Sequence, residues 1–319
     1  YHFIGFEKWY KREYQAPVEM IKQNVNILIY ENTGAEAVRF IDQYSRELKE
    51  SFEITKMLFT SREPYMLDIF ALSRLATFYP LLIKTYKWDK SNAKDDFKRV
   101  AQLVEIISFR FGITKSRSDK GVRRLYWLAR EFKGGFDQLI RDLQNFVEKY
   151  CNNSDFERDL CQPRFHEVVD GGDQRYLLWK YENHLRTAEI PISPEMSYET
   201  FMNAAPQTKF TIEHIIPQNV RDSKKVTVDD SILSITDFEE NYLHSIGNLV
   251  LDSRSANASK SDRDFATKDE QYSKAPLKSQ LELGTFGNPK PARWNHISIS
   301  NRTDKIVKFA LERWNTRNV

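Results

Sequence analysis

The most constraining feature of this chain is a helical spacing of apolar residues that continues from residue 16 to about residue 186. Seven segments in this range carry apolar side chains three or four positions apart, which places each set on one face of a helix. Strand-like alternation is hard to find there, and no fixed repeat period is present. Because seven apolar faces must cover one another, the sequence predicts a mainly α protein whose residues 1–190 form a helical bundle.

The pattern changes after residue 190. Three prolines, Pro191, Pro194 and Pro206, lie in a segment that reads as a connector because proline lacks a backbone donor and restricts its neighbour. Beyond the connector, residues 210–216 alternate with the period of a strand. A polar loop at 219–240 and a second short strand at 246–252 follow, and then serines able to cap a helix. Residues 191–319 are therefore expected to form a second domain with the order strand, loop, strand, helix.

Charge points to a partner through its distribution rather than its total. The chain has 48 Lys and Arg against 45 Asp and Glu, which gives a net charge of only +3. Residues 115–124 contain five basic side chains and one acidic one, and such a cluster can neutralise nucleic-acid phosphates. Within it we single out Arg123 and Arg124 as DNA-binding candidates. A solvated helix entrance explains the same cluster equally well.

Other features exclude several classes of protein. No apolar run approaches the roughly 20 residues needed to cross a bilayer, and the opening residues lack the pattern of a secretory signal. We therefore expect a soluble protein without a membrane partner. The two cysteines, Cys151 and Cys161, form no CxxC pair, which argues against a cysteine-ligated zinc site or a disulfide framework and favours a reducing, cytoplasmic location.

The residues that can carry chemistry lie in the second region. Glu213 and His214 are on the first predicted strand, Asn248 opens the second, and Asn257 and Lys260 follow on the predicted helix. Hydrolysis of a phosphodiester needs a general base for water and a cation to neutralise developing charge. Histidine suits the first task because its ordinary pKa is near neutrality. A carboxylate and an amide oxygen suit the second, because a hard ion such as Mg²⁺ prefers oxygen ligands.

These residues stand in segments that resemble a known family. The segments EHIIPQ (213–218) and HSIGNLVLDSRSANASKSDRDFATK (244–268) resemble the HNH, or ββα-metal, nuclease fold, and in particular the nuclease domain that ends GmrSD-type and SspE-type restriction proteins. The resemblance covers residues 209–319, including a C-terminal helix, and extends more loosely to the helix 175–186. It implies a helical bundle followed by a ββα-metal unit. Asn257 replaces the final histidine of many members, which favours Mg²⁺ or Mn²⁺ over a zinc-like ion.

The resemblance also implies a role for each residue of the motif. His214 would activate the attacking water, and Glu213 and Asn257 would hold one divalent ion. Asn248 would fix the loop behind His214 by hydrogen bonds. Lys260 lies where a cation can contact the phosphate, although a solvent-facing lysine on the helix explains it equally well.

The positions of several other side chains along the sequence suggest their roles. Arg254 and Arg263 flank Asn257 and are candidates for contacts to the DNA backbone. His244, four residues before Asn248, is a third DNA-binding or supporting candidate, although a solvated loop histidine is equally possible. His166 and His184 lie in helical surroundings without ligand-like partners at helical spacing, so we interpret them as structural.

The predicted function is a metal-dependent HNH endonuclease or nickase that acts on double-stranded phage DNA within a bacterial restriction system. Family members usually begin with a nucleotide-hydrolysing sensor domain. Neither a GxxxxGK[ST] loop nor GxGxxG occurs here, so we expect that domain to lie elsewhere in a longer protein. Two alternatives remain from the sequence: a non-catalytic DNA-binding module, and a nuclease directed at RNA.

Overall fold

The computed structural model describes residues 17–31, 34–72, 74–115, 119–188, 192–202, 205–219, 234–286, 288–289 and 292–319. The chain divides into two compact units, each described by itself. The first comprises Tyr1–Met66, Leu75–Ala101 and Asp119–Asp142, and the second comprises Leu67–Arg74, Gln102–Ser118 and Leu143–Val319. Three of the boundaries fall within helices, namely α4 (Pro64–Ala71), α6 (Asp95–Thr114) and α8 (Phe136–Tyr150). The predicted domain boundary at residue 190 stays a prediction.

The first unit is helical in its described residues. Its complete elements are α2 (Pro17–Glu31), α3 (Gly34–Phe59), η1 (Leu75–Phe78), α5 (Tyr79–Trp88) and α7 (Asp119–Glu131). Their apolar faces are buried, as shown by Leu81 and Leu82 of α5 and Leu125 of α7. Lys84 of α5 donates to the carbonyl oxygens at the end of α7, which stabilises that helix end because terminal carbonyls lack partners within the helix.

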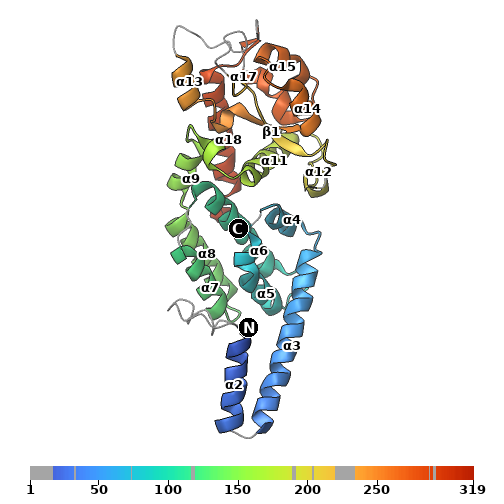
Figure 1. The fold of residues 1–319 in the computed structure, drawn as a ribbon, viewed down its shortest axis with the longest axis vertical. Helices are drawn as coiled ribbons and strands as arrows, with labels where there is room; N and C mark the ends of the chain where they lie inside the picture. Colours follow the sequence, from blue (N-terminus) through green and yellow to red (C-terminus); the bar gives the residue numbers. More distant parts are fainter. Residues whose placement is uncertain are drawn as a thin grey trace. The chain divides into compact units, whose positions relative to one another are not determined.

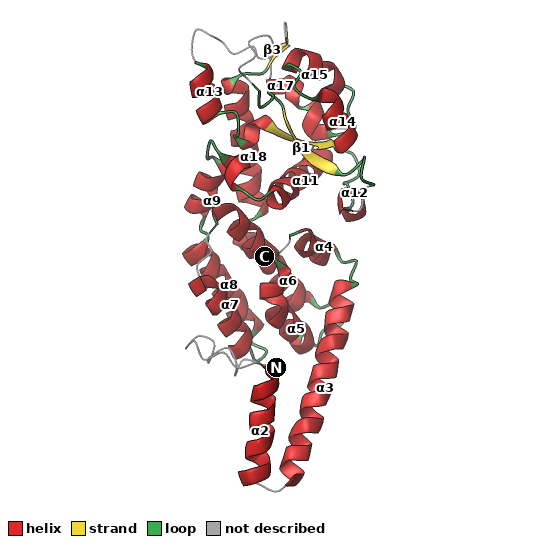
Figure 2. Ribbon diagram, viewed as in Figure 1, coloured by secondary structure: helices red, strands yellow, loops and turns green. Residues whose placement is uncertain are grey.

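In its described part, the second unit holds two small two-stranded sheets, β1–β2 and β3–β4, among helices, and the mainly α prediction is confirmed (Figures 1 and 2). Its elements are α9 (Asn153–Leu160), α10 (Phe165–Val168), α11 (Gly171–Ala188), α12 (Tyr198–Met202), β1 (Phe210–His214), α13 (Ile235–Asn241), η2 (Ile246–Asn248), β2 (Leu249–Ser253), α14 (Arg254–Lys260), α15 (Phe265–Tyr272), α16 (Lys278–Leu281), α17 (Leu283–Phe286), β3 (Asn288–Pro289), β4 (Ala292–Arg293), α18 (His296–Arg313) and η3 (Thr316–Asn318).

β1 and β2 form an antiparallel pair in which Glu213 faces Val250 and His214 faces Leu249 across the strands. α14 and α11 both contact the two strands, and in Figure 1 they lie on opposite sides of β1. The predicted second strand begins three residues late, because residues 246–248 form the 3₁₀ turn η2 instead. The order strand, loop, strand, helix is nevertheless present.

Short caps divide the segment after β2 into two helices where the sequence suggested one. Ser253 caps α14 by accepting from the Ala256 backbone N–H, as its position before the helix predicted. α14 ends at Ser261, whose φ of 45° is left-handed and stops the helix. Asp264 then caps α15 by accepting from Thr267. After this break, Lys268 of α15 reaches the end of β1.

The C-terminal helix α18 holds the turn before β2 in place. The Gly247 N–H donates to Thr303 Oγ1 over 3.2 Å, and a Cβ at Gly247 would lie 2.1 Å from the Ile299 carbonyl oxygen, so only glycine fits. Arg302 donates to the carbonyl oxygens of Gly247 and Leu249 and is fully buried. Arg302 lies in the interior of α18, and its bonds hold the turn against this helix.

Two further features concern the cysteines and the apolar character of the helices. Cys151 is buried and Cys161 exposed, and both are free thiols. In the described part of the chain, none of the helices combines the length and the apolar character that crossing a bilayer requires.

Candidate nuclease site

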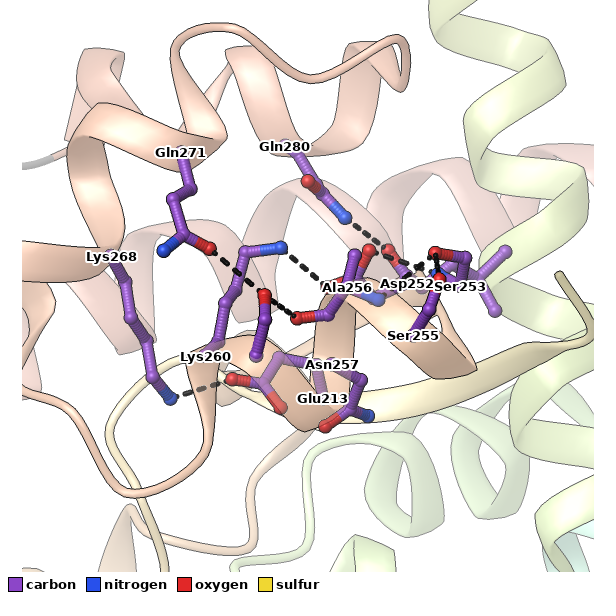
Figure 3. A network of polar contacts seen from close by, with 12 residues as sticks. Glu213, Asp252, Ser253, Ser255, Ala256, Asn257, Lys260, Lys268, Gln271 and Gln280 are labelled. Atoms are coloured by element: carbon purple, nitrogen blue, oxygen red, sulfur yellow. Dashed lines mark hydrogen bonds and ion pairs between the residues drawn. The ribbon is translucent and has the colours of Figure 1, made fainter. Parts of the chain in front are cut away.

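The Glu213 carboxylate lies at the end of β1, between α14 and α15. Its Oε1 accepts a 2.6 Å hydrogen bond from Lys268 Nζ of α15 (Figure 3). The same ammonium donates to the His214 carbonyl oxygen at 2.8 Å. Both side chains are buried, with side-chain exposures of 6% for Glu213 and 1% for Lys268. Lys268 therefore fixes the position of the carboxylate and of the backbone that follows it.

Burial and pairing act in opposite directions on this ion pair. Burial raises the pKa of Glu213, because the carboxylate loses its hydration, and the Lys268 charge opposes that rise. Burial likewise lowers the pKa of Lys268, against the attraction of Glu213. Each charge is tolerated in the interior only because the other is beside it.

Asn257 of α14 is bonded to the strand that carries Glu213. Its Nδ2 donates to Thr211 Oγ1 at 3.0 Å and to the Ile212 carbonyl oxygen at 3.1 Å. These two bonds fix the orientation of the amide, since only the NH₂ group can donate. Among the described residues, Asn257 Oδ1 has no hydrogen-bond partner. Asn257, labelled with Glu213 in Figure 3, is thereby anchored to the two strand residues that precede Glu213.

His214 points to the other face of the strand end, as alternation along a strand requires. Its ring lies 4.5 Å from the ring of His166 and 5.5 Å from that of His244, measured between centroids. Gln218 Nε2 lies 3.3 Å from its Nδ1. The residue is 8% exposed. Burial lowers the pKa of His214 to about 2, and the neighbouring His166, His244 and Lys268 add to the effect, so the imidazole is neutral.

Asn248 is fully buried in η2 and holds the loop that follows His214. Its Oδ1 accepts from the Ile216 N–H at 2.9 Å, and its Nδ2 donates to the carbonyl oxygens of Ile216 and Leu243. One side chain thus joins the segment after β1 to the segment before β2. Its contacts are structural, and none is made with the Glu213 carboxylate or the His214 ring.

We expect Asn248→Ala to destabilise the second unit by at least about 1–3 kcal/mol, because the Ile216 N–H would be left buried without an acceptor. Asn241→Ala is the matched control, since Asn241 is exposed and donates to a carbonyl within its own helix. Urea denaturation of both variants measures the difference. Equal midpoints for the two variants would show that the Asn248 bonds contribute nothing net.

Lys260 differs from both sequence interpretations. Its side chain is 3% exposed, and Nζ lies 2.6 Å from Asp252 Oδ2 and 5.0 Å from the centre of the Tyr272 ring. The last turn of α14 lies over the end of β2, so the lysine neutralises a carboxylate that would otherwise be buried alone. An ammonium held in this way faces neither solvent nor a phosphate.

The DNA-binding candidates are distributed over both units. Arg254 and Arg263 are exposed, and neither forms an ion pair with a described residue. His244 has a side-chain exposure of 19%, and its Nε2 lies 3.7 Å from Glu167 Oε1. In the first unit, Arg123 is half-buried, and Arg124 lies 3.5 Å from Asp142 and 4.0 Å from the centre of the Trp127 ring. Residues 116–118 of the basic segment lie outside the described residues.

The candidate metal ligands form a small oxygen-donor set. The described residues contain no group of three or more His, Cys, Asp or Glu side chains arranged to hold a metal ion. The Glu213–Asn257 pair has one carboxylate and one amide, with Asn257 Oδ1 and one Glu213 oxygen left over after the bonds described above. Two oxygens suit a hard divalent cation, which usually keeps several waters as its other ligands. The residues present therefore fit Mg²⁺ or Mn²⁺.

Two contributors to the site were not selected from the sequence. Lys268 lies three residues after Phe265 and four before Tyr272, both buried, so helical spacing already placed it on the apolar face of α15. A lysine in such a position signals a buried acidic partner. His166 carries no comparable signal, because α10 reaches His214 only through the tertiary fold.

One comparison with known proteins found a match. A family model described as the C-terminal domain of GmrSD restriction endonucleases matches residues 150–309, about half of the chain. The chain therefore carries a domain of a restriction-endonuclease type of nuclease. It belongs to the family of GmrSD C-terminal domains, as its resemblance indicated. Searches among curated proteins and among solved structures gave no match.

Proposed function

We propose that this protein is a metal-dependent HNH endonuclease that hydrolyses DNA phosphodiester bonds, as the nuclease part of a phage-defence restriction protein. The proposal rests on the side chains gathered at the end of β1. Near the end of β1, Lys268 holds the buried Glu213 carboxylate and the Asn257 amide is bonded to the residues just before it. The neutral imidazole of His214 follows on the other face of the strand end, in a domain of a restriction-endonuclease family. Restriction endonucleases cut DNA, which makes DNA the proposed substrate.

His214 is the proposed general base. A neutral imidazole has one nitrogen lone pair, so it can accept the proton of a water molecule as that water attacks phosphorus. The bond from phosphorus to the 3′ oxygen breaks, which leaves a 5′ phosphate and a 3′ hydroxyl. Lys268, bonded to the His214 carbonyl oxygen, and Asn248, bonded to Ile216, hold the backbone that follows the His214 side chain.

Glu213 and Asn257 are the proposed ligands of Mg²⁺ or Mn²⁺. The bound ion supplies positive charge for the phosphate and the leaving oxygen. The chain's own part is to present the two oxygens already oriented, through Lys268 on one ligand and the Thr211 and Ile212 acceptors on the other. Arg254 and Arg263 are proposed to contact the DNA backbone, because both are exposed close to Asn257 in the chain.

The experiment that tests this proposal is a plasmid cleavage assay with a metal titration. We expect nicking or linearisation of supercoiled DNA with Mg²⁺ or Mn²⁺ and none with EDTA. Asn257→Ala should raise the metal concentration for half-maximal cleavage by about 10–100-fold. Removing a group that merely supports a metal ligand already lowers metal affinity by about this factor. Asn301→Ala, an exposed asparagine on α18, should leave it unchanged.

The same assay separates the alternatives. DNA binding without turnover at any metal concentration would indicate a non-catalytic binding module. Faster cleavage of a labelled RNA than of DNA of the same sequence would indicate a nuclease directed at RNA. Either outcome would replace the proposed function.

A further inference from the structure

The His166 ring packs against the ring of His214, the proposed general base. His166 belongs to α10, and not to the β1–β2 pair or to α14, the helix that follows it. The His166 and His214 rings meet edge to face, with an interplanar angle of 88° and a centroid separation of 4.5 Å. The backbone N–H of His166 donates to the His244 carbonyl oxygen at 2.9 Å. α10 is therefore joined to the loop before η2, and its imidazole covers one side of His214.

The orientation of the His166 ring is set by Gln174 of α11. Gln174 Nε2 donates to the carbonyl oxygens of His166 and Val169, at 3.0 and 2.7 Å. Because only the NH₂ group can make these two bonds, Gln174 Oε1 faces His166 Nδ1, 2.8 Å away. Nδ1 must then carry the hydrogen. Both the tautomer and the plane of His166 are thereby fixed.

Gln174 is itself held firmly. It is 1% exposed. The preceding residue, Asp173, accepts two hydrogen bonds from Arg74, at 2.7 and 2.6 Å, a bidentate pairing that resists rotation. Gln174 of α11 therefore orients His166 by hydrogen bonds, and the His166 ring in turn packs against the His214 ring.

We propose that His166 is a positioning residue of the nuclease site, which holds the His214 imidazole in one ring orientation. The inference rests on the proposed function, because the orientation matters only if His214 must direct a lone pair at water. A base whose nitrogen is misplaced by about 1 Å can lose about 10²-fold in rate. His166 itself is not among the proposed DNA contacts, so the loss belongs in kcat and not in KM.

Three variants of His166 test the proposal by cleavage kinetics. His166→Ala and His166→Asn both remove the ring, and the asparagine amide can still donate to Gln174. We expect each to lower kcat by about 10–100-fold with KM changed by less than about threefold. His166→Phe keeps ring packing and should recover most of the lost kcat. His184→Ala is the control, because His184 stacks on Phe309 of α18, away from His214.

Two kinetic results would overturn the inference: wild-type kcat in both variants that lack the ring, or a loss that appears mainly in KM. If His166→Ala does not fold, His166→Asn takes its place, and circular dichroism establishes which variants are folded. A phenylalanine variant as slow as the asparagine variant would also count against ring packing as the cause.

A measurement without DNA separates this inference from the proposed function. Nitrogen-15 spectra of histidine-labelled protein report the tautomer of each ring. We expect His214 to show one tautomer in the wild type and in His166→Phe, and a mixture in His166→Asn. That result together with no cleavage by the wild type would reject the nuclease and leave the positioning intact. An unchanged His214 signal beside normal wild-type cleavage would reject the positioning alone.

Discussion

Replacing His214 with alanine is expected to lower the rate of DNA cleavage by about 10²–10⁴-fold at saturating metal, the range that a general base contributes. His214 is the neutral imidazole at the end of β1, and alanine has no group that can accept the proton of water. The fold should survive, because the His214 side chain makes no strong hydrogen bond within the described residues beyond its long contacts to Gln218, and alanine keeps the backbone carbonyl that Lys268 binds. Circular dichroism checks this.

The matched control is His296→Ala, at the first residue of α18 in the same unit. It removes an imidazole from the unit without touching the strand end, so cleavage should remain close to that of the wild type. The prediction concerns the rate at saturating metal and DNA, which separates loss of the base from weaker binding. Equal cleavage by His214→Ala and the wild type would end the assignment of His214 as the base.

The low pKa of His214 determines how readily its imidazole takes up and holds a proton. At a pKa of about 2 the imidazole stays neutral across the working range of pH, so it is always able to accept a proton but holds that proton weakly. A bound phosphodiester, which is an anion, would favour the protonated ring. The proposed base would thus become stronger once the substrate is bound.

The sequence predicted the parts of the site that depend on short segments. The alternation of residues 210–216 placed Glu213 and His214 on one strand, and Ser253 marked the start of the helix that carries Asn257. Spacing along the chain is sufficient for such features because strand period and helix caps are local. The break at Ser261 was not predicted, since a left-handed serine leaves no pattern in the sequence.

The sequence could not predict which charges meet in the interior. Lys260 was selected for its place one turn after Asn257, yet it pairs with Asp252, and the ammonium beside Glu213 belongs to Lys268 instead. Both lysines follow the strand pair within fifteen residues, and only the turn between α14 and α15 decides which one reaches which carboxylate. His166 shows the same limit, because its distance to His214 is set by how α10 and α11 pack.

The Lys268–Glu213 pair gives the largest expected effect on stability. Lys268→Met is expected to lower the free energy of unfolding of the second unit by about 3–5 kcal/mol, because it leaves the Glu213 carboxylate buried without its partner. Lys274→Met is the matched control on the same stretch of chain. Lys274 pairs with Glu270 at the surface, where both side chains are more than 70% exposed, so its loss should cost no more than about 1 kcal/mol.

The double variant Lys268→Met/Glu213→Gln identifies the cause. Removing both charges should recover most of the stability, because replacing a buried ion pair with neutral groups is often neutral in free energy, whereas removing one partner is costly. Urea denaturation gives the size of the effect, and hydrogen exchange in peptides from β1 and α15 assigns it to this unit. If the single and double variants were equally destabilised, the cost would lie in the carbonyl oxygens of His214 and Ile215 that Lys268 also binds, and the buried charge of Glu213 would not be its source.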